Sequence, residues 1–296
     1  MRFASVTKAL FEAKAHRLPE PPTHRLHFTG TCGAGEFAAR CATHSFWYHS
    51  FYFDNGFEVR GDYDIGRDLA SYGFPKDMSG MSVLDIGTGS GWFATYFEQR
   101  GAVVTTVDAR GYCDFDVFGR PGYPDVRTEK SNPDRVLPDG RPIYYSPVSG
   151  GFWVMKDMLG LRAEYINARV YDLSPALFGG RTFDLVFMGA LLVHLRDPIG
   201  ALMAARSVCR QRLIATTVRH GIPDAEEPPA MMALSGDSIS WWSPNQACLL
   251  RWFRAAGFAR ADADGTVPLT VDKPYVDERG NTSGVNQILA RVDAYV

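Results

Sequence analysis

From residue 81 onwards, the chain alternates between short apolar runs and longer stretches in which apolar residues recur with helical spacing. The apolar runs have the length and composition of buried strands, and they lie at residues 82–86, 102–107, 167–171, 183–188 and 212–218. The stretches with helical spacing lie between and after them, at residues 92–99, 152–161, 198–209 and 244–256. Strands that alternate with helices in this way predict a parallel sheet covered by helices on both faces.

The end of the chain has a different pattern. Two apolar runs, 267–271 and 288–296, follow the last expected helix, and we expect them to pair as antiparallel strands. That helix has Ser243 as its expected N-cap, Pro244 in its first turn and Gly257 after its end. The predicted fold class is therefore α/β, with a Rossmann-like, doubly wound and mostly parallel sheet and an antiparallel C-terminal strand.

Residues 1–78 precede this pattern, and we predict that they form a helical and aromatic N-terminal segment before a domain that spans residues 79–296. A short helix is expected before Pro19. The segment is rich in aromatic residues, namely Phe46, Trp47, Tyr48, Phe51, Tyr52, Phe53 and Phe57. These side chains suit either a satellite core that covers the sheet or a lid over an organic substrate.

Two stretches of the domain, at about 111–150 and 219–240, show little periodicity. Loops of such length are uncommon inside compact domains and are usually functional. We expect both to be inserts, and the first to help select the substrate.

Composition limits the class of protein. The chain has 46% hydrophobic and 22% charged residues, which is typical of globular domains. Its formal net charge of −2 gives no general attraction for nucleic acid. The five cysteines are scattered without a Cys-x-x-Cys pair, so neither a disulfide framework nor a metal site is expected. No signal peptide or membrane-spanning run is expected, which favours a cytoplasmic protein. The sequence leaves open whether the protein forms a homodimer.

Three glycines, Gly87, Gly89 and Gly91, follow the first apolar run directly. Such a turn lets the backbone lie close to a ligand. The loop has no lysine, so it does not fit a phosphate-binding loop. A dinucleotide-binding loop would have its third glycine where Trp92 stands. A dinucleotide site and a purely structural turn remain as alternatives at this point.

Further candidate residues come at the ends of the expected strands. Gly87, Asp108, Asp172 and Met188 each end a strand or follow one. Because the carboxyl ends of parallel strands meet at one edge of a sheet, where ligands bind, we expect these four residues to share one site.

The segment Val83-Leu84-Asp85-Ile86-Gly87-Thr88-Gly89-Ser90-Gly91 resembles the first motif of the class I S-adenosylmethionine-dependent methyltransferases throughout. The resemblance implies S-adenosylmethionine (SAM) as cofactor and S-adenosylhomocysteine (SAH) as product. It implies that Asp85 attracts the cationic part of the cofactor and that Asp108 accepts hydrogen bonds from both ribose hydroxyls. The implied cofactor site comprises Asp85, Gly87, Thr88, Gly89, Gly91, Trp92, Asp108, Ala109, Asp172, Leu173, Met188 and Gly189.

In that family an Asp at the end of the third strand takes the adenine amino group, and the resemblance assigns this role to Asp172. Leu173 would pack on the adenine ring. The resemblance further places the backbone of Met188 and Gly189 beside the amine of the cofactor.

Three other segments are similar to the tRNA wobble-uridine methyltransferase and carboxymethyltransferase group. They are Trp47 to Ser50 with Gly56, Arg60 and Gly61; Gly189 to Pro198; and Trp242 to Asn245 with Ala255 to Phe258. The similarity spans about 47–260. It departs from the group at Val193, where the group has an aromatic residue before its His.

A tRNA enzyme needs basic contacts to phosphate. Candidates for such contacts are Arg206, Arg210, Arg212, Arg251 and Arg254, although arginines on helix faces are commonly just solvated. We expect methyl transfer to a small-molecule acceptor, as a tailoring step of a biosynthetic pathway. The alternatives are an RNA (tRNA wobble-uridine) methyltransferase and a non-catalytic or redox protein that binds a nucleotide cofactor.

Methyl transfer is an in-line displacement, so the enzyme aligns acceptor, methyl and sulfur, and sometimes removes a proton. His194 is predicted as the general base or orienting group, because an unperturbed histidine pKa of about 6.5 suits that role. A purely structural role in its loop is the alternative. Acceptor contacts are expected from Tyr48, His49, Arg60, Trp242 and Asn245.

Overall fold

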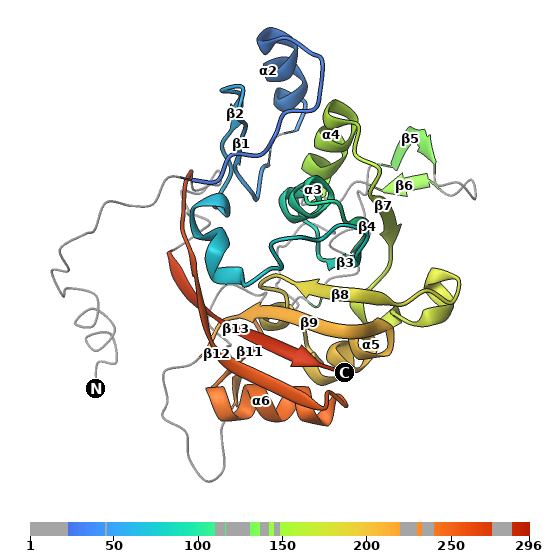
Figure 1. The fold of residues 1–296 in the computed structure, drawn as a ribbon, viewed down its shortest axis with the longest axis vertical. Helices are drawn as coiled ribbons and strands as arrows, with labels where there is room; N and C mark the ends of the chain where they lie inside the picture. Colours follow the sequence, from blue (N-terminus) through green and yellow to red (C-terminus); the bar gives the residue numbers. More distant parts are fainter. Residues whose placement is uncertain are drawn as a thin grey trace, which may run out of the picture.

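The computed structural model describes residues 23–44, 46–109, 116, 131–136, 142–144, 149–219, 230–232, 240–273 and 286–296. A seven-stranded sheet with the order β12-β13-β9-β8-β3-β4-β7 forms its centre (Figure 1). The strands are β3 (Ser82–Ile86), β4 (Val103–Asp108), β7 (Glu164–Asn167), β8 (Phe183–Met188), β9 (Cys209–Thr217), β12 (Arg260–Leu269) and β13 (Gln287–Tyr295).

The five strands from β7 to β9 run parallel, and β13 runs antiparallel to both of its neighbours, β9 and β12. The predicted fold class is therefore confirmed, including the antiparallel pairing of the two runs near the C-terminus. Strand β3 lies between β4 and β8. The order of the strands reverses there, and such a switch point opens a crevice at the carboxyl ends of the strands.

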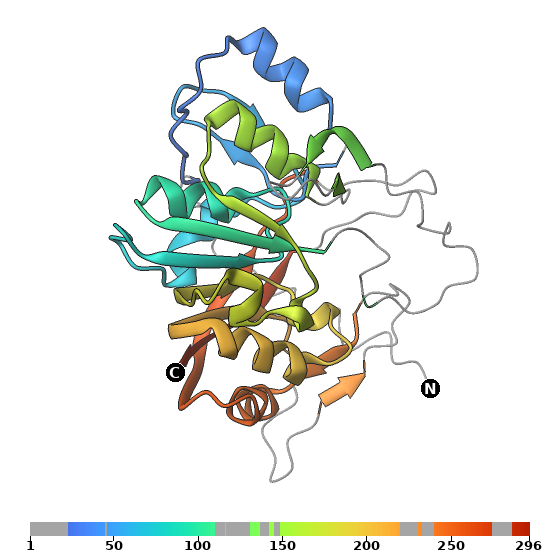
Figure 2. The same ribbon diagram turned by 90° about the vertical axis from the view of Figure 1, so that its right-hand side faces the viewer.

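Helices cover both faces of the sheet, and Figure 2 shows α2 and α4 on the opposite side of it from α5 and α6. The helices are α2 (Ala34–Ala42), α3 (Trp92–Gln99), α4 (Gly150–Leu159), α5 (Pro198–Val208) and α6 (Gln246–Ala255). Alternate residues of β8 face the two layers: Phe187 packs in the cluster with α3 and α4, and Val186 in the cluster with α5 and α6. This alternation explains why the strand is continuously apolar.

Shorter elements complete the described chain. They are the strands β1 (Phe51–Tyr52), β2 (Glu58–Val59), β5 (Ser131–Val136), β6 (Pro142–Tyr144), β10 (Ala230–Met232) and β11 (Trp242–Pro244), and the 3₁₀ helices η2 (Gly66–Tyr72), η4 (Val170–Asp172), η5 (Pro175–Phe178) and η6 (Leu192–His194).

The aromatic segment packs as core. Phe51 and Phe53 have no exposed surface, and they belong to the same hydrophobic cluster as Trp92 and Phe187. Of the two interpretations open from the sequence, the described contacts favour packing over the sheet, because these rings continue the core of the α3 face.

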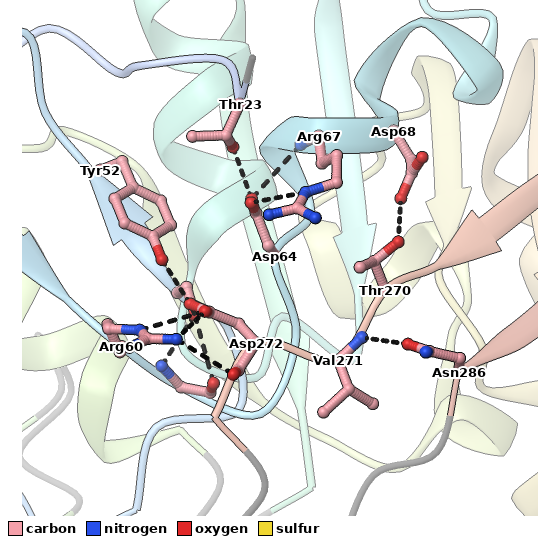
Figure 3. A network of polar contacts seen from close by, with 12 residues as sticks. Thr23, Tyr52, Arg60, Asp64, Arg67, Asp68, Thr270, Val271, Asp272 and Asn286 are labelled. Atoms are coloured by element: carbon pink, nitrogen blue, oxygen red, sulfur yellow. Dashed lines mark hydrogen bonds and ion pairs between the residues drawn. The ribbon is translucent and has the colours of Figure 1, made fainter. Parts of the chain in front are cut away.

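A network of polar contacts fastens this segment to the chain that follows β12 (Figure 3). The carboxylate of Asp272 accepts hydrogen bonds from the Ser50 hydroxyl at 2.6 Å, from the Tyr52 hydroxyl at 2.5 Å and from the Arg60 guanidinium at 2.5 Å. Thr270 donates to Asp68 at 2.7 Å beside it. Residues more than 200 positions apart are thus joined.

Several sequence expectations about element boundaries are wrong: β12 begins at Arg260 instead of 267, β9 begins at Cys209 instead of 212, and two further errors concern the third strand and the N-cap of α6. The third strand covers Glu164–Asn167 instead of 167–171, because it pairs with β4 in the register Asp108 to Asn167. Residues 170–172 form η4. The N-cap of α6 is Asn245, whose side chain accepts the Cys248 N–H at 2.9 Å, while Ser243 pairs in β11. Most of both predicted inserts, and the helix expected before Pro19, lie outside the described residues.

Candidate functional site

The carboxyl ends of four neighbouring strands carry the candidate site. Gly87 follows β3 and donates its N–H to Val107 of β4 at 2.8 Å. Asp108 ends β4, and Met188 ends β8 directly beside Ile86. The structure therefore brings Gly87, Asp108 and Met188 together at one edge, as expected from the sequence.

The glycine loop has a backbone that side chains would disturb. Gly87, Gly89 and Gly91 all have positive φ angles, of 77°, 54° and 85°. Gly91 caps α3, and a Cβ atom there would lie 2.7 Å from the Phe152 ring. A Cβ at Gly87 would meet only Leu191, at 3.7 Å, so the loop has room on that side. Trp92, at the start of α3, is buried and packs as core.

Asp85 is a buried carboxylate beneath this loop. Its Oδ2 atom accepts a hydrogen bond from the Thr88 hydroxyl at 2.8 Å. Burial raises its pKa to about 7, and the neighbouring Asp108 adds to the shift, whereas the bond from Thr88 opposes it. A cationic group placed nearby would favour the ionised form of Asp85.

Asp108 holds the loop in place and keeps capacity for a ligand. Its carboxylate accepts the N–H groups of Gly89 at 3.1 Å and Ala109 at 2.9 Å. Burial raises its pKa to about 6, and these two N–H bonds moderate the shift. A carboxylate has about four acceptor positions, so roughly two remain, which is what two ribose hydroxyls require.

Asn167 is a candidate that the sequence analysis missed. It ends β7 directly beside Asp108 in the sheet. Both polar atoms of its amide are buried, and neither has a hydrogen-bond partner in the described part of the chain. An unpartnered buried amide costs about 1–3 kcal/mol. Its donors and acceptor match the edge of a purine, so the site fits the adenine of the cofactor.

Asp172 does not lie at a strand end. It is exposed and lies in η4, five residues beyond the end of β7. Leu173 is buried in the cluster with Ile86 and Val107. The misplacement follows from the error in the third strand, and the correct register would have pointed to Asn167.

The chain leaves β8 through a strained turn. Ala190 has a φ angle of 50°, the one positive φ among the described non-glycine residues, and its N–H donates to the Thr216 hydroxyl at 3.0 Å. Left-handed backbone costs an alanine about 1–2 kcal/mol. A Cβ atom at the preceding Gly189 would lie 3.0 Å from the Phe187 ring. Packing and hydrogen bonding thus force the chain into this turn.

His194 lies just beyond, in η6, and is half-buried. Its backbone N–H donates to Leu191 at 2.9 Å. Trp241 donates its backbone N–H to Val193 at 2.7 Å, and the Trp242 indole donates to the Arg196 carbonyl at 3.0 Å. The two tryptophans therefore line the loop that carries His194.

The other predicted acceptor residues divide into two groups. Tyr48 donates its backbone N–H to the Ser90 hydroxyl in the glycine loop at 2.9 Å, and His49 follows it. His49 is buried against Phe93, and burial lowers its pKa to about 3.

The side chains of Arg60 and Asn245 are engaged elsewhere. Arg60 is bound to Asp272, and the fully buried Asn245 caps α6.

The described residues contain no group of three or more His, Cys, Asp or Glu side chains that could hold a metal ion. None of the described helices is long and apolar enough to span a bilayer.

Comparison with known proteins identifies the family of the chain. The model of a methyltransferase domain family matches residues 58–261. No curated protein sequence matches the chain. The N-terminal domain of EvdMO1 with SAH bound has a similar fold, with a TM-score of 0.54 and 14% identity over 90% of this chain and 98% of that one.

Two more solved structures are similar. The same EvdMO1 domain in the presence of SAH and D-fucose gives a TM-score of 0.52, with 14% identity over 88% of this chain and 96% of that one. Magnesium protoporphyrin IX methyltransferase (ChlM) from Synechocystis PCC 6803 with bound SAM gives a TM-score of 0.42, with 14% identity over 74% of this chain and 71% of that one. The chain belongs to the methyltransferase domain family and is a class I SAM-dependent methyltransferase.

Proposed function

We propose that this enzyme methylates a small-molecule acceptor, as a tailoring step in a biosynthetic pathway. The observation that carries the proposal is the engagement of arginines that could otherwise contact a phosphate backbone. Arg210 pairs with Asp184, and Arg212 pairs with Asp293. Arg206 donates to the Gly257 carbonyl at 3.2 Å. The two arginines paired with carboxylates have their charge offset and add little to an attraction for RNA, whereas Arg206 keeps its charge.

The cofactor supplies a methyl group on a positively charged sulfur, and the chain has to bind and orient it. We assign the ribose hydroxyls to Asp108, because that carboxylate keeps free acceptor positions beside the glycine loop. We assign the adenine edge to Asn167 in place of Asp172, because only Asn167 combines a strand end with an unpartnered buried amide. Asp85 supplies negative charge near the cationic part of the cofactor.

The acceptor is expected on the side of the site formed by His194 and the Trp241–Trp242 pair. His194 would orient the acceptor or take its proton as the methyl group transfers. The half-buried position of His194, directly after the turn that leaves β8, supports this role.

The test is a labelling experiment with SAM carrying an isotopic methyl group. The purified enzyme is incubated with a small-molecule extract, with sugars such as D-fucose, and with total tRNA in separate reactions. We expect label in the low-molecular-weight fraction and none in tRNA. Labelled tRNA, with binding that weakens steeply as salt rises, would overturn the proposed acceptor class.

A further inference from the structure

We propose that Asp116 is a positioning residue for the loop that carries His194, residues 191–197. The inference rests on the proposed role of His194 on the acceptor side. Asp116 belongs to the first predicted insert, and its carboxylate is 5% exposed. It lies 80 positions before Arg196, the loop residue that it contacts.

The carboxylate of Asp116 has three partners. Oδ2 accepts the backbone N–H of Arg196 at 2.9 Å and a short hydrogen bond from the Tyr171 hydroxyl. Oδ1 accepts the Arg169 guanidinium at 3.1 Å. Hydrogen bonds to an ionised group are roughly twice as strong as neutral ones, so this carboxylate is a firm attachment point.

The partners of Asp116 reach the loop at two further positions. The Tyr171 hydroxyl accepts the N–H of Asp197 at 3.2 Å. The Trp241 indole donates to the Asp116 carbonyl, and its backbone N–H donates to Val193 at 2.7 Å. The loop is therefore held immediately before His194 and again two and three residues after it.

This arrangement makes Asp116 the shared partner of three segments that are remote in sequence. Tyr171 follows β7, Arg196 follows β8, and Trp241 comes just after the second predicted insert. Removing the carboxylate leaves the Tyr171 hydroxyl and the Arg196 N–H without their acceptor, although the glycine loop and Asp108 lose no contact. Asp116 thus sets the orientation of His194 without being part of the cofactor cradle.

The direct test is hydrogen exchange measured by mass spectrometry on the SAH-bound enzyme. We expect Asp116→Ala to raise exchange about tenfold in peptides that cover residues 191–197, because the Arg196 N–H loses its acceptor and the Tyr171 hydroxyl, which accepts the Asp197 N–H, loses its anchor. Exchange in β3 and binding of SAH are expected to stay as in the parent protein. Asp264→Asn, which changes an exposed carboxylate of β12, is the matched control and should leave the loop unchanged.

Tyr171→Phe is the second variant, and it decides the question if Asp116→Ala loosens the whole protein. It removes one hydroxyl, and should raise exchange in residues 191–197 by a smaller factor. Unchanged exchange there in Tyr171→Phe, or in a folded Asp116→Ala protein, would overturn the proposal.

Turnover separates positioning from general stability. With the acceptor found by labelling, Asp116→Ala should lower kcat and leave the KM for SAM unchanged. In a His194→Ala background it should lower kcat no further, whereas an independent additional loss contradicts positioning through His194. If His194→Ala itself has full activity, the proposed role of His194 fails, and the exchange experiment still decides whether Asp116 holds the loop.

Discussion

The proposed cofactor side and the proposed acceptor side of this site are built from contacts of different range. On the cofactor side, the Thr88 hydroxyl bonds to Asp85 three positions away, and the Gly89 N–H bonds to Asp108 nineteen positions away. On the acceptor side, Asp116 bonds to Arg196 across 80 positions and to Trp241 across 125. A short motif can therefore specify the part of the cofactor cradle from Asp85 to Asp108, whereas Asn167 and the acceptor side take their places only when remote segments fold together.

The largest expected effect is on the cofactor side, where the motif is most compact. Gly89→Leu should abolish SAH binding in calorimetry, because a side chain at a left-handed position distorts the loop that holds the cofactor. Gly160→Leu is the matched control. It has a φ angle of 66°, and a Cβ atom there meets nothing within 4 Å. Retained SAH affinity in Gly89→Leu would mean that the cofactor lies elsewhere.

On the acceptor side, His194→Ala should reduce kcat by about 100-fold, the lower end of the range for a general base. Its SAH affinity should remain within about twofold of the parent value, because the cofactor cradle is unchanged. His27→Ala, at an exposed histidine paired with Asp54, is the control for loss of an imidazole. If His194→Ala lowered SAH affinity as much as turnover, the cofactor side and the acceptor side would not have separate roles.

Within the cofactor side, Asn167 and Asp172 can be compared directly. Asn167→Ala should weaken SAH binding about thirtyfold, since the adenine loses its hydrogen-bonding partner in a buried place. Asp172→Ala should change it less than twofold, because Asp172 is exposed in η4. The opposite ranking in calorimetry would restore the assignment expected from the sequence.

The affinity for SAM should depend on pH through Asp85. Its pKa of about 7 in the free protein means that lowering the pH from 8 to 6 protonates it, so the cationic cofactor should bind about tenfold more weakly. Asp85→Asn should abolish this pH dependence of SAM affinity. The weaker pH dependence caused by Asp108, whose pKa is about 6, should remain. If the parent protein binds SAM equally tightly at pH 8 and at pH 6, this account is wrong.

The stability of the ligand-free protein should depend on pH in the opposite direction from SAM binding. The raised pKa means that the folded state binds more protons than the unfolded chain between about pH 4 and 7. The ligand-free protein should therefore lose stability as the pH rises through that interval.

The smallest effect is expected at the turn that leaves β8. Ala190→Gly should raise the free energy of unfolding by about 1 kcal/mol, because glycine adopts the left-handed backbone without strain. Ala38→Gly on an exposed position of α2 should lower it by a similar amount. Chemical denaturation measures both, and a loss of stability in Ala190→Gly would show that the turn is not strained.

The sequence predicted the part of the fold that depends on local pattern. The spans of β3, β8 and α3 agree with the expected ones, because apolar runs of five or six residues and a helix flanked by glycines are local signals. The third strand was misplaced by three residues at its start and four at its end, since the pairing with β4 fixes it and no local signal does. For this reason the sequence pointed to Asp172 as the residue at the strand end, whereas the structure places Asn167 there.

The acceptor side was less predictable for the same reason. Asn245 and Arg60 are polar residues in suggestive segments, yet one caps α6 and the other binds Asp272 across 212 positions. Asp116 carries no local signal at all, and its partners become visible only in the folded chain.

A crystal structure of the enzyme with SAH bound tests the central assignment most directly. It should place both ribose hydroxyls within hydrogen-bonding distance of the Asp108 carboxylate and the adenine edge against the Asn167 amide. SAH bound away from the carboxyl ends of β3, β4 and β7, or an adenine that contacts Asp172 with Asn167 still unpartnered, would contradict the account.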